Sequence, residues 1–312
     1  MDDIAPSSSQ LEKLGARLRR GPLDLADLQQ LRSFLDTLEP FAEKTFNLIR
    51  GLSTRRQRLP PARITRRTAK TVRSIIAKLR RQTTTLRQIQ DLVGCRIVVP
   101  DTRSQEDYAS ALHELFAEAR IVDHRAAPQH GYRALHFIVK DGQQRFEIQL
   151  RTGYQDDWAN LVEKIADRVG IELKYGGGEI ELREALLEVS EKIARSELIE
   201  GSFWIEFEDS SEQVPWMRLW YNGDFVSVLS IGEIAPGTEL LVRTYGTERF
   251  DRLTIAEQYT TWESPWGSMH NYSIKFADGD QAKKHYEGVL DEEELLSNQI
   301  TDLVTQLERR LQ

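Results

Sequence analysis

Residues 145–151 read RFEIQLR, and this alternation of polar and apolar side chains decides the fold of the first half of the chain. Successive residues of a β-strand point to opposite faces, so the three apolar residues would enter a core and the four polar residues would share the other face. Two arginines around a glutamate and a glutamine favour a site on that face over an ordinary surface strand. The stretch therefore predicts a strand with one core face and one charged face.

Similar patterns on both sides of this strand extend the prediction to a domain. β-like segments occupy residues 95–99 and 135–140, with a helical pattern over 107–119 between them. Helical periodicity also predicts two helices within residues 10–50 and others over 69–81, 155–168 and 179–198. We therefore expect an α/β (α+β) domain over residues 1–178, with a mixed β-sheet flanked by helices, followed by a linking helix over 179–200.

The pattern changes after residue 201, where short strand-like segments and five of the six tryptophans occur. Strands are expected at 203–207, 217–220, 225–229, 240–244 and 272–276, and helices at 280–287 and 292–311. Residues 201–312 thus predict a smaller β-rich α+β domain. Its aromatic residues have two readings, core packing or a surface for a partner.

The formal net charge of −7 conceals an uneven distribution. Residues 55–96 hold thirteen Lys or Arg and one acid, whereas residues 201–312 hold twenty Asp or Glu against nine Lys or Arg. Clustered cations suit a polyphosphate or a nucleic acid, and the acidic half could cover such a site. Solvated helix faces are the alternative explanation.

Composition excludes several classes of protein. The 312 residues are 40% hydrophobic, which is enough for two folded domains, and the single Cys95 cannot close an internal disulfide. The chain has no apolar run near 18 residues and no secretion signal, so we expect a soluble cytoplasmic protein without membrane contacts.

Candidate ligand-binding residues gather in the basic segment. Four residues follow spacings of four, four and three on the helix expected over 69–81: Lys70, Ser74, Lys78 and Arg81. That spacing would align them on one helix face, where three cations and a hydroxyl meet one polyphosphate. Asp91 stands before the strand that carries Arg96, where a carboxylate either binds magnesium or caps a turn.

Further motifs follow in order: GYRALH at 131–136, EIQLRT at 147–152, Trp158-Ala159 and Lys174-Tyr175. Together with the basic helix and the DLVGCR segment at 91–96, they resemble the synthetase domain of the RelA/SpoT alarmone enzymes over about residues 45–175. The chain is most similar to the small synthetases of a single activity, including the toxic branch.

The resemblance implies transfer of the β,γ-pyrophosphate of ATP to a ribose 3′-hydroxyl, leaving AMP. It assigns ATP to Lys70, Ser74, Lys78, Arg81 and Arg96. It assigns Mg²⁺ to Asp91 and Glu147, with Glu147 also accepting the hydroxyl proton, and makes both catalytic. It assigns the acceptor to Tyr132, by stacking on the base, and to Arg133, His136 and Gln149. The alternatives are a packing role for Tyr132 and a buried strand histidine at His136.

Departures from the family pattern leave the acceptor open. Thr68 stands where guanosine-specific members have an arginine, and residues 128–132 lack the usual Lys-x-Asn before Gly-Tyr. GDP or GTP is one acceptor class. The 3′ end of tRNA, or an adenine nucleotide, is the other, and arginines at 55, 56, 58, 63, 66 and 67 favour tRNA. A third reading is an inactive nucleotide or RNA sensor.

Two roles remain open for residues 201–312. The first is regulation of the synthetase domain, as a fused antitoxin-like module or a surface for a protein trigger. The second is dimerisation, which would make the protein a homo-oligomer.

Overall fold

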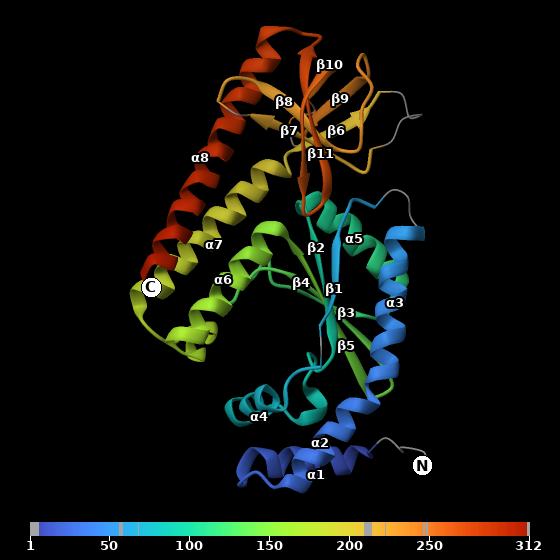
Figure 1. Ribbon diagram of the computed structural model, residues 1–312, viewed down its shortest axis with the longest axis vertical. Coiled ribbons are helices and arrows are strands. Elements are labelled where there is room, and N and C mark those ends of the chain that lie inside the picture. The colour runs from blue at the N-terminus through green and yellow to red at the C-terminus, as the bar shows by residue number, and fades with distance from the viewer. Residues whose placement is uncertain are drawn as a thin grey trace.

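The chain folds around two separate β-sheets joined by a long helix (Figure 1). The computed structural model describes residues 6–55, 59–67, 69–208, 214–221, 223–245, 247 and 249–310, without the side chains of 53–55. No helix in these ranges is long and apolar enough to cross a membrane.

The first sheet has five strands in the order β1-β2-β5-β4-β3. They are β1 (Arg63–Arg67), β2 (Gly94–Val99), β3 (Arg120–Asp123), β4 (Leu135–Asp141) and β5 (Gln144–Thr152). β2 and β5 are parallel, and the other neighbouring pairs are antiparallel. The expected mixed sheet flanked by helices is confirmed, while the edge strands β1 and β3 were not predicted.

The two faces of this sheet differ as the alternation predicts. The apolar face packs on α3 (Glu39–Arg55) and α5 (Thr102–Leu115), and its core includes Phe146, Ile148 and Leu150. Three more helices, α1 (Ser8–Arg20), α2 (Leu25–Thr37) and α4 (Val72–Arg81), extend this core beyond the end of the sheet. The polar face meets α6 (Gly153–Val169), which starts directly after β5.

Helix α6 is fixed at its start by a capping box. Thr152 accepts a hydrogen bond from the backbone of Gln155, and the Gln155 side chain accepts one from the backbone of Thr152. The helix directs Trp158 and Ile165 away from the sheet, into a second core shared with α7 (Ile180–Glu200). A 3-10 turn, η2 (Ile171–Tyr175), connects α6 to α7.

The second sheet has six antiparallel strands in the order β6-β9-β10-β11-β8-β7. They are β6 (Phe203–Phe207), β7 (Trp216–Tyr221), β8 (Val226–Ile231), β9 (Glu239–Thr244), β10 (Arg249–Ser264) and β11 (Gly267–Phe276). The expected β-rich second domain is confirmed. The sequence did not predict β10, and the two helices expected at the end are one helix, α8 (Asp280–Arg310).

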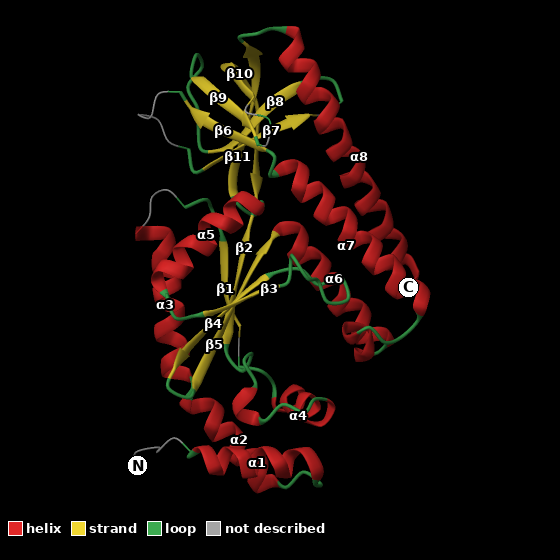
Figure 2. Cartoon of the chain, turned by 180° about the vertical axis from the view of Figure 1, so that it is seen from behind, coloured by secondary structure: helices red, strands yellow, loops and turns green. Residues whose placement is uncertain are grey.

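Helix α8 returns along α7 toward the first domain, and the two helices lie side by side in both views (Figures 1 and 2). Ile300 and Leu307 of α8 join the core of α6 and α7. The second sheet lies at the opposite end of the molecule from α4 (Figure 1). The charge distribution had suggested that the acidic domain could cover the basic helix. The structure shows that it does not (Figure 1).

Gly94 allows β2 and β5 to approach closely. A Cβ at this position would overlap the backbone carbonyl oxygen of Glu147, its partner in the parallel pair. Because strand backbone is not the flexible end of a side chain, the overlap can be relieved only by moving one strand.

Gly94→Ala should therefore destabilise the protein by about 1–3 kcal/mol, the usual cost of overpacking. Gly288→Ala is the matched control, because a Cβ at this position of α8 meets no atom within 4 Å. The control should stabilise the protein by about 0.5–1 kcal/mol, since alanine favours helices over glycine. Urea unfolding measures both, and an unchanged midpoint for Gly94→Ala would contradict this role.

Candidate active site

The polar face of the first sheet places charged residues of three strands in one line. Arg67 of β1 lies opposite Gly94 of β2, and Gly94 lies opposite Glu147 of β5. Because Gly94 has no side chain, the Arg67 guanidinium reaches across β2, and its NH1 donates to Glu147 Oε2 at 3.1 Å. The register of three strands thus supplies the first partner of Glu147.

Glu147 is a buried carboxylate, 6% exposed, with two further partners. Gln149 Nε2 donates to Glu147 Oε2 at 2.8 Å, and His136 Nδ1 lies 3.3 Å from Oε1. Burial alone would raise the pKa of Glu147, but the hydrogen bond from His136 and the charge of Arg67 outweigh it and lower the pKa. The carboxylate is therefore kept ionised in a site with little water.

Asp91 is held by two lysines, which approach from opposite ends of one helix. Lys70 Nζ lies 2.6 Å from Asp91 Oδ2, and Lys78 Nζ lies 2.9 Å from Oδ1. Burial would raise the pKa of Asp91, but the two lysines lower it to about 2. The charge of Asp91 also acts on Glu147, where it opposes ionisation, so the two carboxylates belong to one electrostatic site.

The predicted alignment on one helix face is wrong for Lys70. Helix α4 begins at Val72 with Thr71 as its N-cap, so Lys70 lies outside the helix. Ser74 is exposed and accepts a hydrogen bond from the Thr71 hydroxyl at 2.8 Å. Arg81 places its guanidinium 3.7 Å above the ring of Tyr175. Of these four candidates, only Lys70 and Lys78 meet, and they do so at Asp91.

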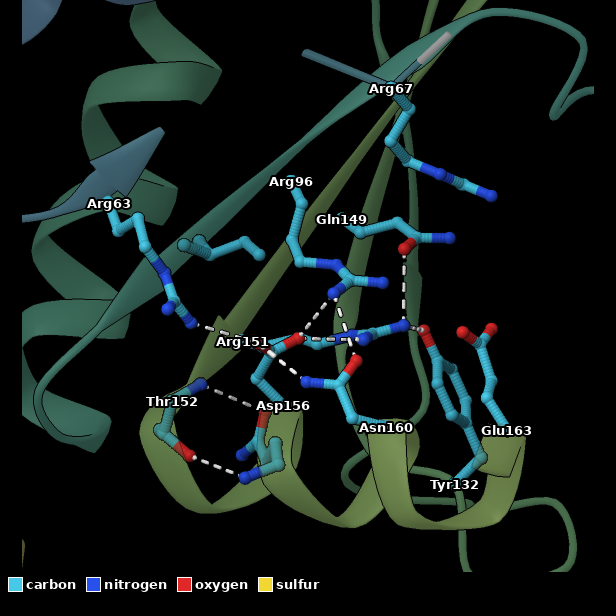
Figure 3. A network of polar contacts seen from close by, with 12 residues as sticks. Arg63, Arg67, Arg96, Tyr132, Gln149, Arg151, Thr152, Asp156, Asn160 and Glu163 are labelled. Atoms are coloured by element: carbon cyan, nitrogen blue, oxygen red, sulfur yellow. Dashed lines mark hydrogen bonds and ion pairs between the residues drawn. The ribbon is translucent and has the colours of Figure 1, made fainter. Parts of the chain in front are cut away.

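Arg96 belongs to a second charged cluster, which surrounds Asp156 of α6 (Figure 3). Its NH1 lies 3.0 Å from Asp156 Oδ1 and donates to Asn160 Oδ1 at 3.2 Å. Arg63 and Arg151 bind the same carboxylate, each through an N–H that lies within 3.1 Å of it. Three strands thus direct one arginine each at one helix residue.

The GYRALH motif brings Tyr132 and His136 to the edge of this cluster. Gly131 has a φ of +86°, and a Cβ there would also press on the Trp158 ring, so the glycine and the Trp-Ala motif depend on each other. The Tyr132 hydroxyl lies 2.7 Å from His136 Nε2 and accepts from Arg151 NH2 at 2.9 Å. The motif therefore joins both charged clusters.

The Tyr132 ring is half-buried and contacts three neighbouring side chains. Its ring meets His124 and His136 edge-on, at interplanar angles of 66° and 72°, and packs in the core around Trp158. Gln149 is buried between Glu147 and Arg151. The residue set expected to bind the acceptor thus forms internal hydrogen bonds here.

Arg133 points away from Glu147 and toward α7. Its Nε donates to Ser190 Oγ at 3.1 Å, and its NH1 donates to the carbonyl of Arg125 at 2.9 Å. Arg133 also lines a cleft of about 1150 Å³ between the two domains, together with Arg103, Trp204 and Trp216. This cleft contains none of the residues predicted to bind ATP or Mg²⁺.

Three of the six arginines that favoured tRNA form ion pairs within the described structure. Arg63 binds Asp156, Arg66 binds Glu39 and Arg67 binds Glu147. The side chains at 55, 56 and 58, and residue 68, lie outside the described residues.

The donor set fits a magnesium ion that the substrate completes. No group of three or more His, Cys, Asp or Glu that could hold a metal occurs among the described residues. Mg²⁺ is commonly held by one or two carboxylates together with substrate phosphates and water. Asp91 and Glu147 match this requirement, since both are ionised and each is held only by exchangeable ion pairs and hydrogen bonds.

Three residues of the site escaped the sequence analysis. Arg67 was considered as one of the arginines that favour tRNA, and Asp156 and Asn160 were assigned no role. Their spacing of four places both on one face of α6, and Asn160 Nδ2 donates to Asp156 Oδ2 at 3.2 Å. The spacing of four, directly after the EIQLRT strand, was the sequence feature that could have indicated these two residues.

Comparison with known proteins identifies this part of the chain. Residues 66–167 match the region found in RelA / SpoT proteins. This segment carries Arg67, Lys70, Asp91, Glu147 and Asp156, so the resemblance drawn from the motifs is confirmed for residues 66–167, which form a RelA/SpoT-type segment.

Two relatives match a longer segment of the chain than the family region does. Uncharacterized proteins of Mycobacterium tuberculosis (strain ATCC 25618 / H37Rv) and Mycobacterium bovis are each 32% identical over 175 residues. The match covers 54% of this chain and 62% of each relative.

Solved structures resemble the chain at lower identity. Small alarmone synthetase 1 from Bacillus subtilis, bound to its product pppGpp, has a TM-score of 0.45 at 23% identity and covers 55% of this chain and 94% of its own. A GTP pyrophosphokinase family protein from Streptococcus pneumoniae has a TM-score of 0.43 at 23% identity and covers 55% and 89%.

The lowered pKa of Asp91 predicts a pH-dependent contribution to stability. Since the pKa falls from 3.8 to about 2 on folding, the contribution is present above pH 4 and is lost as the pH falls toward 2. It should amount to about 2 kcal/mol. Urea unfolding without divalent cations should therefore show Asp91→Asn less stable than the wild type at pH 7, with the difference shrinking toward pH 3.

Asp141→Asn is the matched control, because Asp141 is an exposed aspartate at the end of β4. The control should follow the wild type at every pH. A difference for Asp91→Asn that stays constant from pH 7 to pH 3 would contradict the assignment.

Proposed function

We propose that the protein is an ATP-dependent pyrophosphokinase that transfers the β,γ-pyrophosphate of ATP to the ribose 3′-hydroxyl of GDP or GTP. The observation that carries this proposal is the ionised, buried Glu147 beside an Asp91 held by Lys70 and Lys78, within the RelA/SpoT-type segment. The chain matches about three fifths of the length of its curated relatives.

The reaction needs alignment and charge neutralisation more than covalent help. The 3′-hydroxyl oxygen forms a bond to the β-phosphorus, and the bond from that phosphorus to the α,β-bridging oxygen breaks, so AMP leaves. The hydroxyl proton passes to Glu147, whose low exposure keeps water from competing. Lys70 and Lys78 offset the charge that grows on the bridging and leaving oxygens.

Binding of ATP with magnesium would exchange the partners of the two carboxylates, Asp91 and Glu147. The triphosphate takes the place of Asp91 at Lys70 and Lys78, and Asp91 and Glu147 would then hold Mg²⁺. When bound, Mg²⁺ neutralises phosphate charge and orients the β- and γ-phosphates. In the structure the pairs keep Asp91 ionised before substrate arrives.

A guanine nucleotide is our first candidate over tRNA because three of the arginines counted toward tRNA form internal ion pairs. Arg63, Arg66 and Arg67 form ion pairs with Asp156, Glu39 and Glu147. Phosphate contacts along a tRNA need cations free to bind the backbone. The tRNA 3′ end and an adenine nucleotide stay as alternatives that the same assay tests.

Glu147→Gln should lower product formation at least about 100-fold, because general-base catalysis contributes about 10²–10⁴-fold. The assay incubates the full chain with γ-labelled ATP, Mg²⁺ and, separately, GDP, GTP, AMP, unlabelled ATP or bulk tRNA. Glu118→Gln, an exposed glutamate before β3, is the control and should match the wild type.

Each result of this assay has one meaning. Label on GDP or GTP supports the proposal. Label on tRNA or an adenine nucleotide alone would show that this species, and not a guanine nucleotide, is the acceptor. If no acceptor is labelled and Glu147→Gln equals the wild type, the chain is an inactive sensor.

We also propose that residues 201–312 act on the acceptor side of the site through α7. Ser190 of α7 donates to the carbonyl of Gly131 at 2.6 Å and accepts from Arg133. Further along α7, Glu197 binds Thr152 and Gln155 at the start of α6. Since α8 packs along α7, a partner that shifts α8 would move these contacts.

Ser190→Ala should raise the KM for the acceptor about 5–30-fold, because it removes two hydrogen bonds of about 0.5–1 kcal/mol each, and leave the KM for ATP unchanged. Ser196→Ala is the matched control, because this buried α7 serine has a hydroxyl without a hydrogen-bond partner among the described residues. Steady-state kinetics of the full chain measures both. Equal changes for the two substrates would contradict a role directed at the acceptor.

A further inference from the structure

Asp156 is the residue that organises the polar face of the first sheet, although no motif assigned it a role. Its carboxylate lies on α6, and the residue is 1% exposed. Arg63, Arg96 and Arg151 each lie within 3.1 Å of its two oxygens (Figure 3). A carboxylate so buried is stable only when cations and hydrogen bonds replace its water.

The most buried of the three arginines that bind Asp156 also reaches the Glu147 cluster. Arg151 NH1 donates to Asp156 Oδ1 at 3.0 Å, while its NH2 donates both to Tyr132 Oη at 2.9 Å and to Gln149 Oε1 at 3.1 Å. Arg151 is itself 4% exposed. Its guanidinium therefore has one orientation that satisfies all three acceptors.

The contacts beyond Arg151 close into a ring around the candidate active site. The Tyr132 hydroxyl lies 2.7 Å from His136 Nε2, and His136 Nδ1 lies 3.3 Å from Glu147 Oε1. On the other side, Gln149 bridges from Glu147 Oε2 at 2.8 Å back to Arg151. Five side chains from three segments are thus joined in one cycle of hydrogen bonds.

The chemistry of the donors sets the direction of the bonds in this ring. A guanidinium can only donate, so the Tyr132 oxygen accepts from Arg151. The Glu147 carboxylate can only accept, so His136 presents an Nδ1–H to Glu147 Oε1. In that neutral tautomer Nε2 is an acceptor and takes the Tyr132 proton.

We propose that Asp156 is a positioning residue: by holding Arg151, it fixes the direction of the hydrogen bonds that run from Tyr132 through His136 to Glu147. This inference rests on the proposed function, in which Glu147 receives the acceptor proton. With Arg151 released, Tyr132 loses its fixed donor, and His136 can adopt the other tautomer. The Nδ1 lone pair then faces the Glu147 carboxylate, which loses a hydrogen bond and its fixed orientation.

The first test needs no substitution at Asp156. Long-range ¹H–¹⁵N spectra of the full wild-type chain, without nucleotide or divalent cations, distinguish the two histidine tautomers, and His136→Asn identifies the signals of His136. The proposal requires the Nδ1-protonated form. The Nε2-protonated form in the wild type would overturn it, whether or not any variant folds.

The second test substitutes the carboxylate. Asp156→Asn should lower kcat about 10–100-fold, the usual effect of removing a residue that orients a catalytic group, and change the KM for ATP less than about threefold. It should also populate both tautomers of His136. Tyr132→Phe keeps the packed ring and removes only the hydroxyl. This variant should also populate both tautomers of His136.

Asp157→Asn is the matched control, since Asp157 is the exposed neighbour on the same helix. It should retain the wild-type kcat and the Nδ1-protonated tautomer. An unchanged kcat and tautomer in folded Asp156→Asn would overturn the positioning role. Absence of labelled product from the wild type would instead refute the proposed function, and the spectra would still decide the order of the hydrogen bonds.

Discussion

The burial of carboxylates on one face of a β-sheet is the constraint on which the rest of the structure depends. Removing an ion from water costs several kcal/mol even after relaxation, so each buried carboxylate needs partners that replace the water. Glu147 has Arg67 and His136, and Asp156 has arginines from β1, β2 and β5. These partners come from strands that are distant in sequence. The site therefore exists only when the whole sheet and α6 are assembled.

Local sequence patterns predicted the strands and helices that have one buried apolar face. The alternation in residues 145–151 and the patterns in the neighbouring segments predicted β2, β4, β5 and α6, because a strand or helix with one buried face repeats its apolar residues at a fixed period. The short edge strands β1 and β3 escaped, since their residues are mostly polar or charged and no core face repeats in them. Lys70 was misplaced because Thr71 caps the helix one residue later.

Pairing between distant segments was beyond the reach of sequence patterns. Asp91 and Glu147 could be singled out from their motifs, but nothing local shows that two lysines meet at Asp91 or that Arg67 crosses a glycine to reach Glu147. Asp156 looked no different from its neighbour Asp157. The distinction between them, one buried under three arginines and one exposed, depends on the packing of α6 against the sheet.

The structure gives a different explanation for the uneven charge distribution of the chain. The basic segment does not face the acidic domain, which lies at the other end of the molecule and reaches the first domain through α7 and α8 (Figure 1). Many of its cations instead neutralise the few acids of the site. The clusters therefore hold more cations than acids before a substrate arrives. A triphosphate with its metal ion would exchange one set of partners for another.

The stoichiometry of the nucleotide products tests the central claim most directly. In a reaction of the full chain with γ-labelled ATP, GDP and Mg²⁺, chromatography separates AMP, ADP and the labelled acceptor product. Transfer of an intact pyrophosphate predicts one AMP for each labelled product, with no ADP formed. Formation of ADP in place of AMP would show transfer of a single phosphoryl group and would contradict the account.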